Sequence, residues 1–193
     1  MSWRTPVTAR GDSFDARVEI VKYDPAWPAA FEREKALLEG IIGQWLAGGI
    51  EHVGSTAVPG LAAKPVIDMM APVASLGASR QAIVAAGRAG YCHWPHRADE
   101  MHWFCKPSPS CRTHHLHLVP LASRLWIERL AFRDALRDDQ ALASEYAELK
   151  KRLARKFPLD REAYTAGKGS FVGRVLSAAG FRDGQPPLSA RTG

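Results

Sequence analysis

The sequence predicts a mixed α/β fold of the α+β kind, in which a β-sheet with flanking helices is followed by a C-terminal helical cap. Short apolar segments separated by turns occupy the first two-thirds of the 193-residue chain, as the strands of a sheet do. After Pro120 the apolar residues recur at helical spacing. Helices that follow the strands in this way are typical of a sheet covered by a separate helical layer.

The first half of the chain alternates helix and strand. Asp24 and Pro25 provide a cap and a first helical residue, and Gly48-Gly49 ends the helix that follows. A short apolar strand from Ile50 leads into a Gly-Ser turn, and the segment 66–70, Val-Ile-Asp-Met-Met, forms a second apolar strand. Between them lies a segment of small residues, so this region predicts a strand-turn-strand unit.

A hairpin and three helices are expected in the remainder. The apolar run Met101–Lys106, a Pro-Ser-Pro-Ser loop and the strand containing His115 read as a β-hairpin. The other expected elements are a helix from Ser79 through Gly87, a strand Tyr91–Trp94, and helices Leu121–Asp139, Gln140–Lys156 and Asp160–Ala179. We therefore expect a mixed sheet of about four or five strands.

Domain boundaries follow from composition. Residues 18–181 are expected to form one domain, with its sheet part at about 18–120 and its helical cap at about 121–181. Residues 1–17 are predicted to be a flexible arm without the apolar core of a signal peptide, and residues 182–193 a flexible tail. No run is apolar enough for a membrane span, and three cysteines without paired spacing fit a cytoplasmic protein.

Net charge points to an anionic partner. The formal charge of +6 and the isoelectric point near 9.5 favour binding of nucleotides or small phosphorylated metabolites. The arginines of residues 124–137, however, alternate with acidic residues, which is typical of the solvated faces of helices. No basic stripe interleaved with aromatic residues occurs, so nucleic-acid binding is not favoured.

The Gly-Ser turn is the first candidate binding element. Gly54 gives the backbone freedom, and Ser55 and Thr56 add hydroxyl groups, so the turn can present donors to a phosphate. Asp68 follows thirteen residues after Ser55, in an apolar strand where a charge requires a partner. The pattern suggests a phosphate cradle facing a metal-binding carboxylate, although a structural turn and an arginine-paired aspartate would give the same pattern.

Several blocks of residues resemble those of the GrpB family, within the polymerase-beta-like nucleotidyltransferase superfamily. The matching blocks are Glu51-His52-Val53-Gly54-Ser55-Thr56, Val58-Pro59-Gly60-Leu61, Lys64-Pro65, Ile67-Asp68, Tyr23-Asp24-Pro25-Ala26-Trp27, Thr113-His114-His115-Leu116-His117-Leu118-Val119, and Tyr164 with Lys168 and Phe171. The resemblance runs from about Val18 to Phe181 and implies a nucleotidyltransferase-like fold. It also implies that Lys168 contacts phosphate or substrate, unless it only extends outward beside packed aromatic residues.

The same resemblance implies a metal-dependent activity, but this chain departs from the superfamily's pattern of metal ligands. Active members of the superfamily carry a Gly-Ser turn and two acidic residues that flank one apolar position on the next strand. In this chain Asp68 fills the first acidic position, but Met70 occupies the second. Because a thioether is a poor ligand for Mg²⁺, a site that holds two magnesium ions is not expected to form in the usual way.

Two histidines provide an alternative set of ligands. His115 and His117 are two apart on a predicted strand, so their side chains share one face. If that strand lies beside the strand of Asp68, the three residues suit zinc, manganese or iron better than magnesium. The alternative is that both imidazoles only hydrogen-bond to Asp68 and Ser55. Asp68 and His117 are the candidate catalytic residues.

Cations around this centre are the candidate phosphate ligands. Lys64 offers a point charge, and Arg112 can hold two phosphate oxygens at once.

The sequence leaves three functions open, including whether the protein is an enzyme at all. They are a nucleotidyltransferase-like enzyme acting on a nucleoside triphosphate with a divalent metal, a catalytically inactive nucleotide- or phosphometabolite-binding module, and a transition-metal hydrolase that uses Asp68, His115 and His117.

Overall fold

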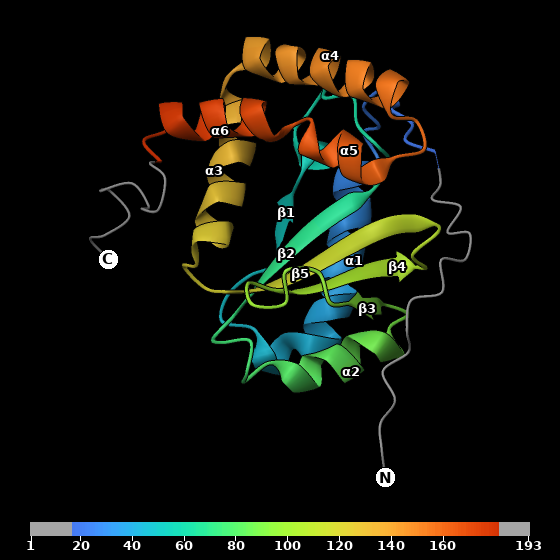
Figure 1. Ribbon diagram of the computed structural model, residues 1–193. Helices are drawn as coiled ribbons and strands as arrows, with labels where there is room; N and C mark the ends of the chain where they lie inside the picture. Colours follow the sequence, from blue (N-terminus) through green and yellow to red (C-terminus); the bar gives the residue numbers. More distant parts are fainter. Residues whose placement is uncertain (1–16, 182–193) are drawn as a thin grey trace, which may run out of the picture.

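The computed structural model describes residues 17–181, which form a five-stranded sheet with helices on both faces (Figure 1). The strands are β1 (Glu51–Val53), β2 (Ile67–Val73), β3 (Cys92–Trp94), β4 (His102–Pro107) and β5 (Arg112–Pro120). The helices are α1 (Trp27–Ile42), α2 (Arg80–Arg88), α3 (Arg124–Asp138), α4 (Gln140–Lys156), α5 (Arg161–Ala166) and α6 (Gly169–Ala178), with short 3₁₀ turns at η1 (Gly43–Trp45) and η2 (Ser55–Ala57). The predicted mixed α/β class is confirmed.

The sheet is mixed, with strand order β1-β2-β5-β4-β3. β2 and β5 run parallel at its centre, and the other neighbouring pairs are antiparallel. In the central pair Asp68 stands opposite His115, and Met70 stands opposite His117. The strand of His115 therefore lies beside the strand of Asp68, the condition on which the three-residue site depends.

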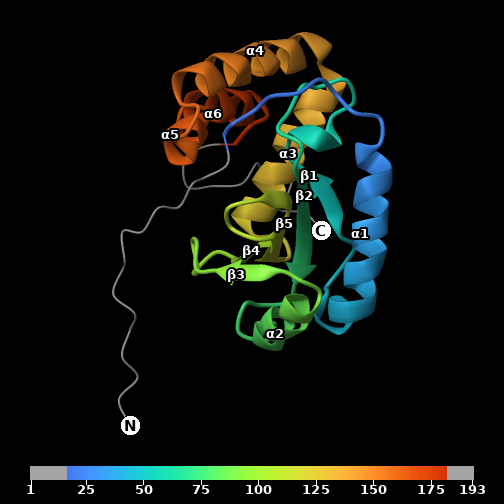
Figure 2. The ribbon, with the colours of Figure 1, turned by 90° about the vertical axis from the view of Figure 1, so that its right-hand side faces the viewer.

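Each face of the sheet is buried by a different set of helices. α1 and α2 cover one face through a core that includes Phe31, Ala82, Met69 and Leu116. Figure 2 shows α1 along one side of the sheet, with α3 on the other side and α4, α5 and α6 gathered near one end. Asp68 and His117 belong to the face turned toward α3, because they alternate with the residues that face α1.

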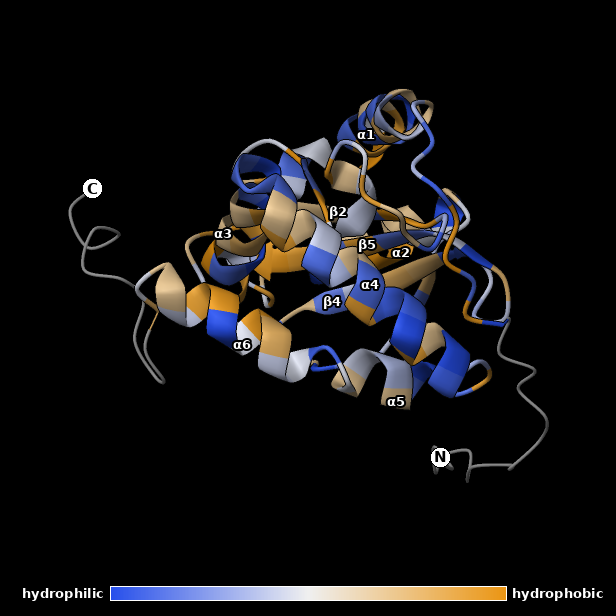
Figure 3. Ribbon diagram, turned by 90° about the horizontal axis from the view of Figure 1, so that it is seen from above, coloured by the Kyte–Doolittle hydropathy of each residue, from blue (hydrophilic) through white to orange (hydrophobic). Residues whose placement is uncertain are grey.

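The C-terminal helices form the predicted cap and pack mainly on one another. Their shared cluster joins α3, α4 and α6 to the segment after the Gly-Ser turn, and contains Val58, Leu61, Leu136, Ala143, Tyr146, Phe171 and Val175. Seen from above, α4 carries hydrophilic residues on its outer side (Figure 3), where Arg152, Arg155 and Lys156 are exposed. These basic residues lie on a solvated face near the C-terminal end of α4, where positive charge also suits the helix dipole.

One predicted helix is divided in two. Residues 160–179 form α5 and α6, with Gly167 and Lys168 at the break. A Cβ atom on Gly167 would lie 2.5 Å from Cδ2 of Leu153, so the chain passes very close to α4 at this point. Glycine therefore suits this position, a requirement that arises from tertiary packing.

The short strand β1 directs its two polar side chains to opposite faces. Oε2 of Glu51 accepts a hydrogen bond of 2.6 Å from Arg133 of α3. The His52 ring stacks on Phe31 of α1 with 4.6 Å between ring centroids, and Nε2 lies 3.0 Å from Thr56 Oγ1. Glu51 is thus the residue that faces the cap.

Most of the expected terminal arm and all of the expected tail lie outside the described residues. Within residues 17–181, no helix combines the length and the apolar character that crossing a bilayer requires.

Candidate functional site

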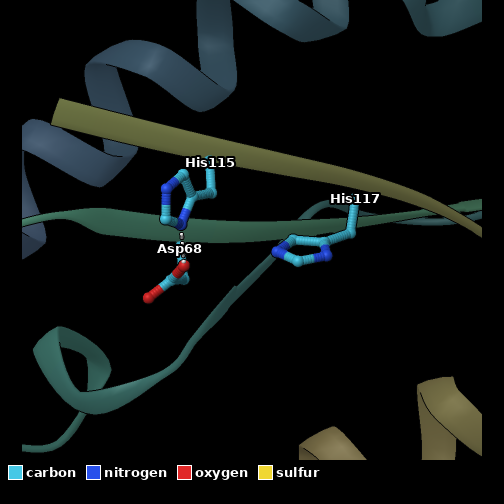
Figure 4. Close-up of side chains that lie close together, drawn as sticks. All are labelled: Asp68, His115 and His117. Carbon is cyan, nitrogen blue, oxygen red and sulfur yellow. Dashed lines mark hydrogen bonds and ion pairs between the residues drawn. The ribbon is translucent and has the colours of Figure 1, made fainter. Parts of the chain in front are cut away.

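A carboxylate and two imidazoles converge at the centre of the sheet, beneath the helical cap. Nδ1 of His115 lies 2.8 Å from Oδ1 of Asp68, and one ligand atom from each of Asp68, His115 and His117 lies within 4.8 Å of the others. Figure 4 shows the three side chains pointing toward one another from β2 and β5. The parallel pairing of these strands creates the cluster, since it sets Asp68 beside His115. His117 lies two residues further along β5 and therefore points to the same face of the sheet.

The backbone at Gly54 is shaped to accommodate Asp68. Gly54 has φ 72° and ψ −172°, a conformation essentially restricted to glycine. A Cβ atom at this position would lie 2.5 Å from Oδ2 of Asp68. The Gly-Ser turn and the carboxylate are therefore in direct contact.

The surroundings keep Asp68 ionised and His117 neutral. Burial alone would raise the pKa of Asp68, but the hydrogen bond from His115 and the positive charge of Lys64 hold that pKa well below its usual range. Burial lowers the pKa of His117 to about 3, and the charge of Arg129 contributes to this shift. A carboxylate and a neutral imidazole are the protonation states that a metal ion requires.

The chemical types of these donor groups suit a divalent transition metal. Two imidazoles and one carboxylate leave a fourth position open, as catalytic zinc sites do. Ligands at about 2.1 Å from a tetrahedral metal lie about 3.4 Å apart, so the present spread of up to 4.8 Å is wider than bound metal would require. Within the described residues, Nε2 of His115 is buried without a hydrogen-bond partner.

Two lysines from different parts of the chain meet over one aromatic ring near the centre. Nζ of Lys64 lies 5.2 Å, and Nζ of Lys168 4.7 Å, from the ring centroid of Tyr164. Burial lowers the pKa of Lys168 to about 8, and the charge of Lys64 adds to this, whereas Asp68 opposes it. Two ammonium groups beside a single carboxylate favour binding of an anion.

The hydroxyls of the turn have different partners. Thr56 donates to the Val66 carbonyl at 3.0 Å and contacts His52, so its hydroxyl holds the turn together. Its side chain is 1% exposed, which does not support the predicted phosphate contact. Ser55 is instead hydrogen-bonded to the buried hydroxyl of Tyr146 in α4, and this bond ties the cap to the turn.

Arg112 lies one aromatic ring away from the centre. Its guanidinium is 5.2 Å from the Trp103 ring centroid, and the Trp103 ring is 5.2 Å from the ring of His115. Its Nε also donates to the Pro109 carbonyl at 2.8 Å. A phosphate bound by Arg112, as the sequence predicts, would therefore lie beside Trp103.

Sequence reasoning missed two residues that the cap brings to the site. Arg129 of α3 lies close enough for its charge to lower the pKa of both His117 and Lys168. Tyr146 of α4 reaches Ser55. In the sequence Arg129 looks like part of an alternating charged helix face, and Tyr146 like a core residue. Neither pattern contains a signal for the site, because both positions depend on how the cap docks.

The fold and the site together define an α+β protein in which a mixed sheet and a helical cap enclose a carboxylate and two imidazoles, beside a glycine-serine turn. Comparison with known proteins gives the family. A family model described as "GrpB protein" matches residues 17–178, and the chain belongs to the GrpB family.

Individual relatives agree with this assignment. The chain is 43% identical over 171 residues to a UPF0157 protein of Pseudomonas aeruginosa, covering 86% of this chain and 69% of that protein. It is 36% identical over 165 residues to the glutamate-rich protein GrpB of Alkalihalophilus pseudofirmus, covering 83% and 94% of the two chains. The crystal structure of the conserved protein GrpB from Enterococcus faecalis superimposes with a TM-score of 0.75 at 33% identity, covering 83% of this chain and 96% of that one.

Proposed function

We propose that this GrpB family protein is a metal-dependent enzyme that transfers a nucleotidyl or related phosphoryl group from a nucleoside triphosphate. The observation that carries the proposal is the convergence of Asp68, His115 and His117 on one face of the sheet, within 4.8 Å of one another. A single divalent ion, Mn²⁺ or Zn²⁺ in preference to Mg²⁺, suits these donors. When bound, it would polarise a phosphoryl oxygen.

The cations supply the second half of the argument. The ammonium groups of Lys64 and Lys168 lie 5.2 and 4.7 Å from the ring centroid of Tyr164, and both interact electrostatically with Asp68. This arrangement supports binding of a phosphate next to the carboxylate. Arg129 adds a third positive charge from α3. In phosphoryl transfer most of the catalysis comes from positioning and charge neutralisation, which is the work such side chains can do.

Met70 argues for one metal ion in place of two. Met70 is 1% exposed and stands opposite His117 across the central strand pair. His117 therefore supplies, from the neighbouring strand, a ligand beside the position where Met70 provides none. We infer that the donor set has moved from a pair of carboxylates on one strand to a carboxylate and imidazoles on two.

The test is thermal denaturation of the protein with ATP, GTP, CTP or UTP, each in the presence of Mn²⁺, Zn²⁺, Mg²⁺ or a chelator. A ligand at one hundred times its dissociation constant adds about 2.7 kcal/mol to the free energy of unfolding, which shifts the midpoint visibly. We expect a shift that requires metal and that Asp68→Asn abolishes. The control is Asp99→Asn, an exposed carboxylate outside the centre. A nucleotide shift that is unchanged in Asp68→Asn would refute the proposal.

The open fourth position favours one second candidate, a transition-metal hydrolase. It predicts tightly held zinc after purification and hydrolysis of a simple phosphate ester without nucleotide. Binding of nucleotide with no turnover toward any acceptor, in contrast, would indicate a binding module.

A further inference from the structure

An exposed tryptophan lies on the same face of the sheet as the polar centre. Among the five tryptophans of residues 17–181, Trp94 alone is exposed, at 57%. It stands opposite Trp103 in the β3–β4 pair, and Trp103 stands opposite His117 in the β4–β5 pair. Residues directly opposite one another share a face, so Trp94, Trp103 and His117 form a row across three strands.

The row continues the site outward. The Trp103 ring is 5.2 Å from the His115 ring and 6.3 Å from the ring of His96, and the Arg112 guanidinium lies 5.2 Å from it. His96 is exposed and close enough for its charge to influence His117. Aromatic rings and a guanidinium thus extend from the polar centre to the edge of the sheet.

Packing does not account for Trp94. Trp103 on the adjacent strand is 9% exposed and belongs to the core cluster under α3, whereas Trp94 lies outside that cluster. An edge strand is ordinarily protected by charge or proline, and a large exposed indole there increases the risk of edge-to-edge pairing. A flat ligand that stacks on this ring would account for its position.

We propose that Trp94 is a stacking platform for the base of the nucleotide whose phosphates bind at Asp68 and the lysines. This inference rests on the proposed function, and it names the substrate class as an intact nucleotide in contrast to a phosphate or polyphosphate. Two strand spacings separate Trp94 from His117, about 10 Å. That span fits a nucleoside unit with its phosphate at the centre and its base over the indole.

Calorimetric titration with ATP and with inorganic triphosphate, both with Mn²⁺, separates the two contributions. Loss of base–aromatic stacking is expected to weaken binding about fivefold or more. In Trp94→Ala we expect ATP to bind at least fivefold more weakly while triphosphate binding is unchanged. Trp94→Phe should retain most of the ATP affinity, and Val84→Ala, a 63% exposed position on α2, should leave both affinities unchanged.

The outcomes distinguish the platform from the function on which it rests. Equal ATP affinity in Trp94→Ala and the wild type overturns the platform, as does a wild type that binds triphosphate as tightly as ATP. In both cases the phosphate site stands. A wild type that binds neither compound overturns the proposed function and the platform together. Equal loss of ATP and triphosphate binding in Trp94→Ala shows a structural effect and also overturns the platform.

Discussion

Replacing Gly54 by alanine should disrupt the centre more than it disrupts the fold. At φ 72° and ψ −172° an alanine would cost about 1–3 kcal/mol in backbone strain alone. Its Cβ would also lie 2.5 Å from Oδ2 of Asp68, so the carboxylate must move. Moving it breaks the 2.8 Å hydrogen bond to His115, a charge-assisted bond that contributes about 1.5–3 kcal/mol. The sum is a loss of about 2.5–6 kcal/mol.

Gly60 offers a matched control on the same segment. It has φ 77°, and a Cβ atom there would meet nothing within 4 Å. Gly60→Ala should therefore cost only the left-handed backbone, about 1–2 kcal/mol. Urea denaturation would give the two free energies, and calorimetry would give Mn²⁺ affinity. We expect Gly54→Ala to lose Mn²⁺ binding and Gly60→Ala to retain it.

The reasoning would be refuted by one result in particular. If Gly54→Ala were no less stable than Gly60→Ala and bound Mn²⁺ equally well, Asp68 would not depend on the turn. Each kcal/mol corresponds to about 2–4 °C in the thermal midpoint of a domain of this size, so the two variants are easily distinguished.

Two further predictions concern buried titratable groups. Burial lowers the pKa of His52 to about 4, so between pH 7 and pH 5 the unfolded chain takes up a proton that the folded chain does not. His52 should contribute about 2 kcal/mol to the fall in the free energy of unfolding over that interval, so the fall measured by urea denaturation should be about 2 kcal/mol smaller in His52→Gln. Burial and the charge of Lys168 lower the pKa of Lys150 to about 7. Raising the pH from 7 to 9 should stabilise the wild type by about 2 kcal/mol relative to Lys150→Met, and parallel pH curves for the two proteins would contradict this.

Much of the candidate site could be predicted from local patterns. The spacing of two between His115 and His117 places both on one face of a strand, and the glycine before Ser55 indicates a turn open to a neighbouring group. In the structure the neighbouring group is the carboxylate of Asp68, which lies against Gly54. These features were accessible because they depend on strand periodicity and on backbone conformation.

The features that could not be predicted depend on how distant segments dock. Tyr146 and Arg129 reach the centre only because the cap packs over it, and their spacing in the helices describes a core position and a charged face. The break at Gly167 lies where the chain packs closely against Leu153 of α4. The sequence also cannot show that the Thr56 hydroxyl, an expected phosphate contact, donates its hydrogen bond to the Val66 carbonyl.

The parallel pairing of β2 and β5 also has a consequence for how the chain folds. Asp68 and His115 are 47 positions apart, whereas β4 and β5 join through a short loop and can pair early. Contacts across a long loop are usually made late in folding, because the entropy of closing the loop must be overcome first. The donors of the centre would then come together after the transition state. An ion bound there would slow unfolding and leave the rate of folding nearly unchanged, so it would lengthen the lifetime of the native protein without helping it to form.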